Sequence, residues 1–168
     1  MTRTSRLLLA AVVAAGVLVP AGSAIAADRT GTLDSTTTSF AWDSKLGTGV
    51  TTLSNLHDKV PCGTPVVHDC DFTLLHVVGL GTIDVKETQG SPNAVDTDLY
   101  VYDSDAAGTK GDLEGTSAQG SPTPNEEVVF DAISDDGYYL VETDYTDNLD
   151  AGGGVKGVAT FTPAPTTP

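Results

Sequence analysis

Short runs in which apolar and polar residues alternate make up much of the chain beyond residue 38, and turn-forming residues separate them. Alternation puts apolar side chains on one face of an extended segment, so an alternating run predicts a β-strand with one buried face, while the largely apolar runs over 72–78 and 98–103 predict strands covered on both faces. Helical periodicity is almost absent from residue 27 onward. The predicted strands cover residues 39–42, 49–53, 72–78, 82–86, 98–103, 127–131, 137–142 and 155–162.

The segments between these runs are polar. Residues 27–38 are rich in Thr and Ser and are expected to form a flexible polar leader, and residues 104–125 are expected to form a Gly-rich loop. Seven to eight short strands with turns between them and hardly any helix predict an all-β fold, an antiparallel β-sandwich or jelly roll. One such domain would span residues 39–162, followed by a Pro/Thr-rich tail over residues 163–168.

The run over residues 98–103 is the most informative of these patterns. Its centre, 99–102, is fully apolar and lies between Asp96 and Asp98 on one side and Asp103 and Asp105 on the other. Aromatic and β-branched residues favour a strand that is covered on both faces. We therefore expect Leu99 and Val101 to pack on one face and the two tyrosines on the opposite face, with the four acids at a rim of the sheet.

The first 26 residues have the pattern of a secretory signal peptide. Arg3 and Arg6 precede an apolar core over residues 7–19, and small residues at 24–26 supply a cleavage site. The core is shorter than the roughly 18 residues that span a membrane. We expect cleavage after Ala26 and release of a secreted, extracellular chain with no membrane span.

Acidic residues dominate the charge, with 23 Asp and Glu against eight Lys and Arg. Loss of the signal peptide removes two of the basic residues and none of the acids, which changes the net charge from −15 to −17. Nucleic-acid binding needs clustered Lys and Arg, so it is not expected here. An acidic surface instead favours solubility or affinity for divalent cations.

The two cysteines, Cys62 and Cys70, are expected to pair in an exported protein. The disulfide would close a short loop and contribute about 2.5 kcal/mol in the chain-entropy model. A metal site made from both cysteines with His57 and His68 is the alternative. Export and the absence of a C-x-x-C spacing disfavour that alternative.

Calcium is the candidate cofactor. Asp103, Asp105, Gly108 and Glu114 match four positions of an EF-hand loop, although Ala107 occupies a ligand position and strands flank the segment. With Asp96 and Asp98 they give a candidate calcium set, Asp96, Asp98, Asp103, Asp105 and Glu114. A second acidic cluster comprises Glu142, Asp144, Asp147, Asn148 and Asp150. Both clusters can equally be turn formers, because Asp and Asn bond to their own backbone.

No catalytic residues are predicted. The chain has no G-x-S-x-G motif, and His76 is expected to be a half-buried structural residue in an apolar strand. Five glutamates among many solvated aspartates single out no pair for glycoside hydrolysis. Aromatic rings can stack on sugars, but core packing is expected for at least four of the six, which are Trp42, Tyr100, Tyr102, Tyr138, Tyr139 and Tyr145.

Three segments carry a family resemblance. DTDLYVYDSDAAG (96–108), DDGYYLVETDY (135–145) and GVATFT (157–162) resemble the bacterial pre-peptidase C-terminal domain. The resemblance covers roughly residues 71–162 and implies a small sandwich module of secreted enzymes, with Asp96 and Asp98 as the acids of its motif. It also implies calcium binding, which occurs in some relatives such as the collagen-binding domains of clostridial collagenases.

The sequence therefore predicts a secreted, non-catalytic accessory or binding module of this type, with calcium as the candidate ion. The expected partner is an extracellular protein or a polysaccharide. The alternative is an extracellular protease-associated inhibitor or accessory factor, which would reduce protease activity stoichiometrically.

Overall fold

The computed structural model of this chain describes residues 27–45, 70–89, 97–119, 125–145 and 154–165. All regular structure in these residues is β, as predicted. The strands are β1 (Arg29–Leu33), β2 (Ser39–Lys45), β3 (Cys70–Val78), β4 (Gly81–Gln89), β5 (Thr97–Ser104), β6 (Lys110–Ser117), β7 (Asn125–Asp131), β8 (Asp136–Tyr145) and β9 (Gly154–Pro163). No helix in these ranges is long and apolar enough to cross a membrane.

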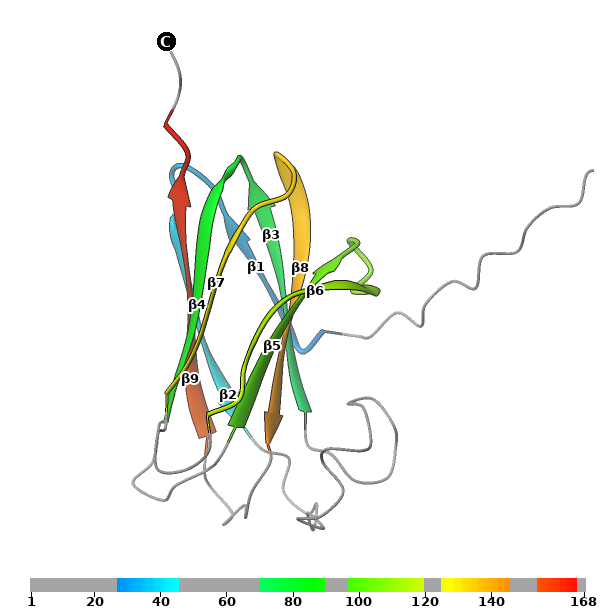
Figure 1. The fold of residues 1–168 in the computed structure, drawn as a ribbon, viewed down its shortest axis with the longest axis vertical. Coiled ribbons are helices and arrows are strands. Elements are labelled where there is room, and N and C mark those ends of the chain that lie inside the picture. The colour runs from blue at the N-terminus through cyan, green and yellow to red at the C-terminus, as the bar shows by residue number, and fades with distance from the viewer. Residues whose placement is uncertain (1–26, 46–69, 90–96, 120–124, 146–153, 166–168) are drawn as a thin grey trace, which may run out of the picture.

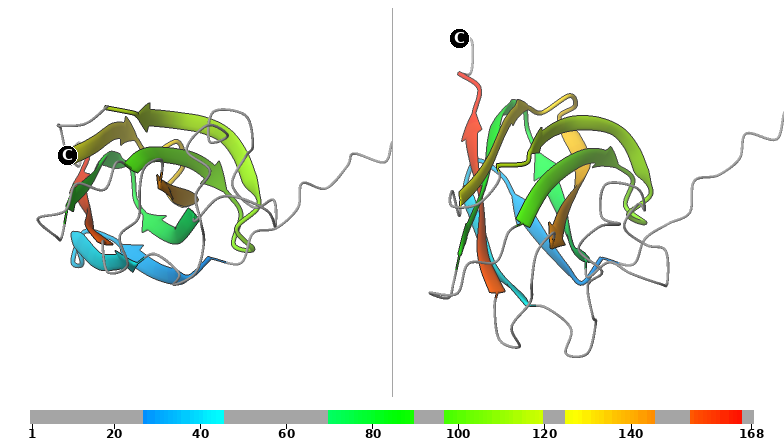
Figure 2. Two further views of the ribbon diagram at one scale, coloured as in Figure 1. Left: turned by 90° about the horizontal axis from the view of Figure 1, so that it is seen from below. Right: turned by 60° about the horizontal axis from the view of Figure 1, so that its bottom comes forward.

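The strands form two sheets that face each other, which confirms the predicted β-sandwich (Figures 1 and 2). The five-stranded sheet has the order β1-β3-β8-β5-β6, and the four-stranded sheet has the order β2-β9-β4-β7. Every pairing is antiparallel except that of β1 with β3, which is parallel. The sheets meet along their edges, where β1 contacts β2 and β6 contacts β7.

The two ends of the sandwich differ, and we name them after Figure 1. At the upper end β3 turns directly into β4 at Gly79, and β7 turns into β8 over residues 132–135. At the lower end β3 begins at Cys70 and β4 ends at Gln89.

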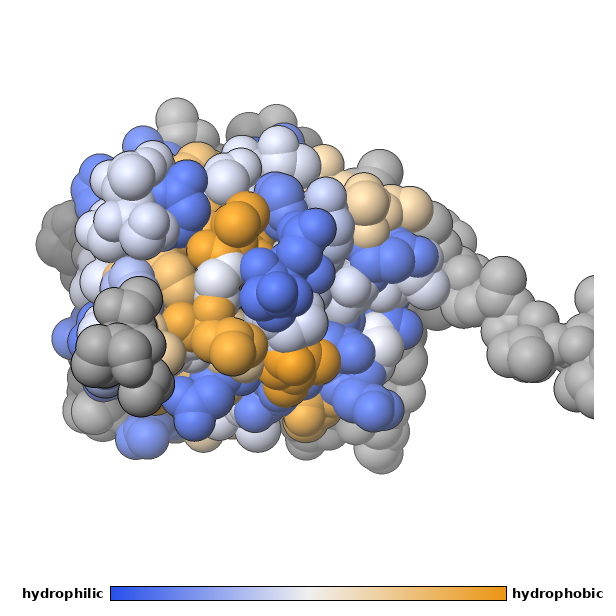
Figure 3. All heavy atoms as spheres, turned by 90° about the horizontal axis from the view of Figure 1, so that it is seen from above, coloured by the Kyte–Doolittle hydropathy of each residue, from blue (hydrophilic) through white to orange (hydrophobic). Residues whose placement is uncertain are grey.

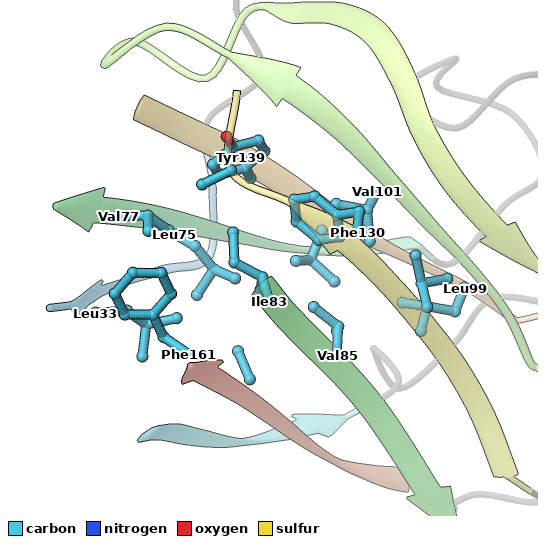
Figure 4. Packing of buried hydrophobic residues seen from close by; sticks show 14 of the residues in the cluster. Leu33, Leu75, Val77, Ile83, Val85, Leu99, Val101, Phe130, Tyr139 and Phe161 are labelled. Atoms are coloured by element: carbon cyan, nitrogen blue, oxygen red, sulfur yellow. The ribbon is translucent and has the colours of Figure 1, made fainter. Parts of the chain in front are cut away.

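The core lies between the sheets and follows from the alternation in the sequence. On β4, Ile83 and Val85 point inward and are fully buried, while Asp84 and Lys86 point outward. Figure 4 shows side chains from both sheets meeting in this layer. The inward residues include Leu33, Leu75, Val77, Leu99, Val101, Phe130, Tyr139, Val141, Ala159 and Phe161.

Trp42 packs in this core only because its neighbour on β9 is a glycine. Gly157 pairs with Trp42 across the two strands, and a Cβ added to Gly157 would lie 2.0 Å from the indole Cε2. Such a contact is far inside van der Waals distance, so any larger residue at 157 would displace the ring. Gly157 therefore has a packing role.

Two segments predicted as irregular are strands. Residues 29–33, which the composition assigns to a flexible leader, form β1, and Leu33 is fully buried in the core. Residues 110–117, assigned to a Gly-rich loop, form β6 at the edge of the five-stranded sheet. The predicted strand over residues 49–53 lies outside the described residues.

Candidate functional site

The acids of the candidate calcium set are spread over β5 and the hairpin that follows it. Asp98 pairs with Asp144 of β8 near the lower end, whereas Asp103 lies five residues further along β5. At ~3.3 Å per residue the two aspartates are about 17 Å apart, too far to share one ion. Asp96 lies outside the described residues. The set as a whole therefore does not form a single site.

Asp105 shapes the turn between β5 and β6. Its Oδ1 accepts hydrogen bonds from the backbone N–H groups of Ala107 at 2.9 Å and Thr109 at 3.0 Å. These bonds lower the pKa of the Asp105 carboxyl, and the bond from Thr109 has the largest effect. Gly108 takes a positive φ of 78° in the same turn. The carboxylate is thus engaged by the backbone of its own turn, as aspartate commonly is.

Asp103 and Glu114 are the members of the set that the structure brings together. Burial raises the pKa of Glu114, and the negative charges of Asp103 and Asp112 raise it further. Oδ1 of Asp103 is buried with no hydrogen-bond partner in the described part of the chain. Within that part, however, no group of three or more His, Cys, Asp or Glu side chains is arranged to hold a metal ion.

The second acidic cluster is only partly described. Glu142 and Asp144 lie on the outer side of β8, where Glu142 forms an ion pair with Lys110. Asp147, Asn148 and Asp150 lie outside the described residues, and so do His57, His68 and Cys62. Cys70 is the first residue of β3, and its disulfide with Cys62 stays a prediction.

His76 has the structural role that its strand predicts. The imidazole stacks on Tyr138 with ring centroids 4.5 Å apart, and its Nε2 lies 2.6 Å from Oδ1 of Asp136. Its side chain is 31% exposed. The histidine therefore holds neighbouring strands together on the outside of the five-stranded sheet.

Aromatic rings gather on that outer side. Tyr100 and Tyr102 of β5 stack with centroids 6.5 Å apart, and His76 and Tyr138 form the second stack on β3 and β8. All four rings are half-buried, and we call them the aromatic face. As expected, Leu99 and Val101 face the core while the tyrosines take the opposite side.

Beside the rings lies a second, smaller apolar cluster, formed by Phe72, Leu74 and Leu140 with Tyr138 packed against it. The Lys110 ammonium lies 4.5 Å from the Tyr102 ring centroid and 5.6 Å from that of Phe72. At these distances the cation is attracted to the faces of both rings. Trp42 and Tyr139 pack in the central core, whereas Tyr100, Tyr102 and Tyr138 lie on this outer side, where Tyr138 packs against the smaller cluster.

The outer side of the four-stranded sheet is different. Its residues are largely Thr, Asp, Lys and Glu, with Val129 and Val158 as exposed apolar exceptions. Lys156 pairs there with Asp43 at 2.9 Å between Nζ and Oδ1. One outer face is thus an ordinary solvated surface, whereas the other carries rings.

Buried acids between the sheets are a feature that sequence reasoning missed. Trp42, Gly157, Glu87 and Glu126 form one row across the four-stranded sheet near its lower end. Both glutamates point inward, with 1% and 2% of their surface exposed. The signal was present, because Glu87 continues the inward alternation of Ile83 and Val85.

Hydroxyl groups of the opposite sheet meet these acids. Thr143 of β8 donates to Oε1 of Glu87, and Ser117 of β6 donates to Oε2 of Glu126. Oε2 of Glu87 has no hydrogen-bond partner among the described residues. Burial raises the pKa of Glu87 to about 8, and the charges of Asp71 and Glu126 contribute to that rise. We call this set the polar layer.

Comparisons with known proteins leave the family open. No protein-family model matches the sequence, and no curated protein matches it. One similar solved structure is the pre-peptidase C-terminal domain of a collagenase from Bacillus anthracis, at 14% identity over 78% of this chain and 94% of that one, with a TM-score of 0.44. Another is PliG of Aeromonas hydrophila, a periplasmic inhibitor of g-type lysozyme, at 11% identity over 81% of this chain and 100% of that one, with a TM-score of 0.37. Similarity at this level assigns neither family nor function.

Proposed function

We propose that this chain is a secreted, non-catalytic binding module of pre-peptidase C-terminal type, and that its aromatic face contacts an extracellular protein or polysaccharide. The aromatic face is the observation that supports this function. An antiparallel sheet in a sandwich usually exposes polar residues on its outer side. Four half-buried rings on three adjacent strands depart from that pattern.

The chemistry of the face suits a flat ligand with an apolar surface. Tyr100 and Tyr102 lie parallel to within 17°, and His76 and Tyr138 to within 10°. Such rings can stack on sugar rings or on proline. Their strands are central in the sheet, so the rings are held in place before a ligand arrives.

The test is retention of the chain from Ala27 onward on insoluble collagen, chitin and bacterial cell wall. We expect saturable retention on one of these, weakened about tenfold in Tyr100→Ala/Tyr138→Ala. The matched control is Val129→Ala/Val158→Ala, which trims the outer face of the other sheet and should bind like wild type. Circular dichroism verifies that each variant is folded.

Three outcomes would contradict the proposal. Folded wild type that is not retained on any of the three materials has no ligand of the proposed class. Turnover in a broad hydrolase screen, abolished by a point substitution, would make the chain an enzyme. Stoichiometric loss of protease activity on titration would favour the inhibitor instead.

We also propose that calcium stabilises the hairpin between β5 and β6 through Asp103 and Glu114. The support is their proximity and the unpartnered, buried Oδ1 of Asp103. An ion bound at 100 times its dissociation constant adds about 2.7 kcal/mol to the free energy of unfolding. Wild type should therefore melt several degrees higher in millimolar calcium than in EDTA, and Asp103→Asn/Glu114→Gln should not. Identical wild-type melting curves would exclude calcium.

A further inference from the structure

The upper end of the sandwich carries an exposed apolar surface separate from the aromatic face. Val78 and Leu80 lie at the turn between β3 and β4, and Ile133 lies at the turn between β7 and β8. They are 42%, 53% and 63% exposed, respectively. Figure 3 looks down on this end and shows an apolar area with hydrophilic residues around it. We call these three residues the apex.

Hydrogen bonds between neighbouring turns fix the apex in one shape. The N–H of Gly79 donates to the Asp135 carbonyl at 2.8 Å, and the N–H of Ala132 donates to the Gly81 carbonyl at 2.8 Å. The N–H of Ala164, beyond β9, donates to the Leu80 carbonyl at 2.8 Å. Three segments distant in sequence are therefore joined beneath the exposed side chains. Little conformational entropy remains to be lost when a partner docks.

Acidic residues flank Ile133 of the apex in the segment that joins β7 to β8. Asp131 ends β7, Asp135 is the last residue of the turn, and Asp136 begins β8. All three are exposed, and the turn segments 78–81 and 131–136 contain no Lys or Arg. The chain as a whole has a net charge of −15. The field around the apolar residues is thus negative.

We propose that the apex docks a basic polypeptide, one that presents apolar side chains flanked by lysine or arginine. Exposed aliphatic groups with a polar rim are typical of protein interaction sites. The acids select the partner, because opposite charges speed association and like charges oppose it. A second copy of this chain would bring its own acids against these and is disfavoured. An anionic lipid surface is disfavoured for the same reason.

The experiment uses two fluorescent helical peptides with the same leucine face, one with lysine and the other with glutamate on its polar face. Anisotropy should show the lysine peptide binding the folded chain from Ala27 onward and the glutamate peptide failing to bind. The double substitution Leu80→Ser/Ile133→Ser should weaken the affinity for the lysine peptide about tenfold. Val129→Ser, an exposed valine elsewhere, should leave binding unchanged.

A charge control separates docking at the apex from attraction to the whole acidic chain. Asp131→Asn/Asp135→Asn should weaken binding more than Asp112→Asn/Glu127→Gln, which removes two charges away from the apex. Equal effects of the two pairs, equal binding of both peptides, or undiminished binding by Leu80→Ser/Ile133→Ser would each overturn the proposal. None of these outcomes depends on the aromatic face, so the proposed function is tested separately.

Discussion

Glu87 is a carboxyl group held between two sheets with one oxygen unpartnered in the described chain. Moving a charged carboxylate out of water is unfavourable, and its neighbours Asp71 and Glu126 are acids as well. Arg29 offsets part of this, since its guanidinium lies 2.8 Å from Oδ2 of Asp71. The neutral acid is consequently the form that the folded protein favours, with a pKa of about 8.

This raised pKa predicts that stability falls as the pH rises. An ordinary glutamate ionises at 4.5, so the folded state retains a proton that the unfolded state loses between pH 4.5 and 8. The resulting stabilisation is fully present below pH 4.5 and is lost as the pH rises through 8. Each tenfold difference in proton affinity between the two states corresponds to ~1.4 kcal/mol. Between about pH 5 and pH 9, the free energy of unfolding measured in urea should therefore fall by a few kcal/mol more for wild type than for Glu87→Gln.

The control for this measurement is Glu127→Gln, one residue along from Glu126 and exposed on the other side of the strand. The free energy of unfolding of this variant should depend on pH in the same way as that of wild type. Parallel profiles for wild type and Glu87→Gln would show that the proton is not held at this carboxyl.

At the scale of elements, β1 contributes more to the fold than its composition suggests. It is only five residues long and lies at the edge of its sheet, but Leu33 is fully buried against both sheets. Truncating a buried leucine to alanine costs about 2–5 kcal/mol. Leu33→Ala should lower the free energy of unfolding by that amount, measured in urea, whereas Thr32→Ala on the exposed side should change it little. Equal, small effects would mean that β1 is not docked in solution.

β1 and β6 also show where sequence reasoning fails. The central strands are predictable because their own residues alternate or are continuously apolar. β1 is polar apart from Leu33, and it is fixed by parallel pairing with β3, some forty residues away in sequence. β6 pairs irregularly with β5, and its half-buried and exposed residues do not alternate, so it offers no regular pattern for sequence reasoning to detect. These two edge strands depend on their partners, whereas β7, also at an edge, shows a regular alternation of buried and exposed residues.

At the scale of the whole molecule, the sandwich was predictable while its surfaces were not. Alternation identifies which residues point inward but does not say which outer face remains exposed. Tyr100 and Tyr102 are expected opposite the core, yet their meeting with His76 and Tyr138 follows from the order β3-β8-β5. The apex likewise joins turns whose proximity only the topology creates.

The polar layer lies at one end of the sandwich, and this placement has a consequence for local unfolding. Hydrogen bonds tie the turns together at the upper end, whereas the layer at the lower end places acids bonded to hydroxyl groups between the sheets. Partial opening should therefore start from the lower end. In native-state hydrogen exchange, amide protection along β4 should decline from Ile83 toward Glu87. The Glu87→Met substitution should flatten that gradient.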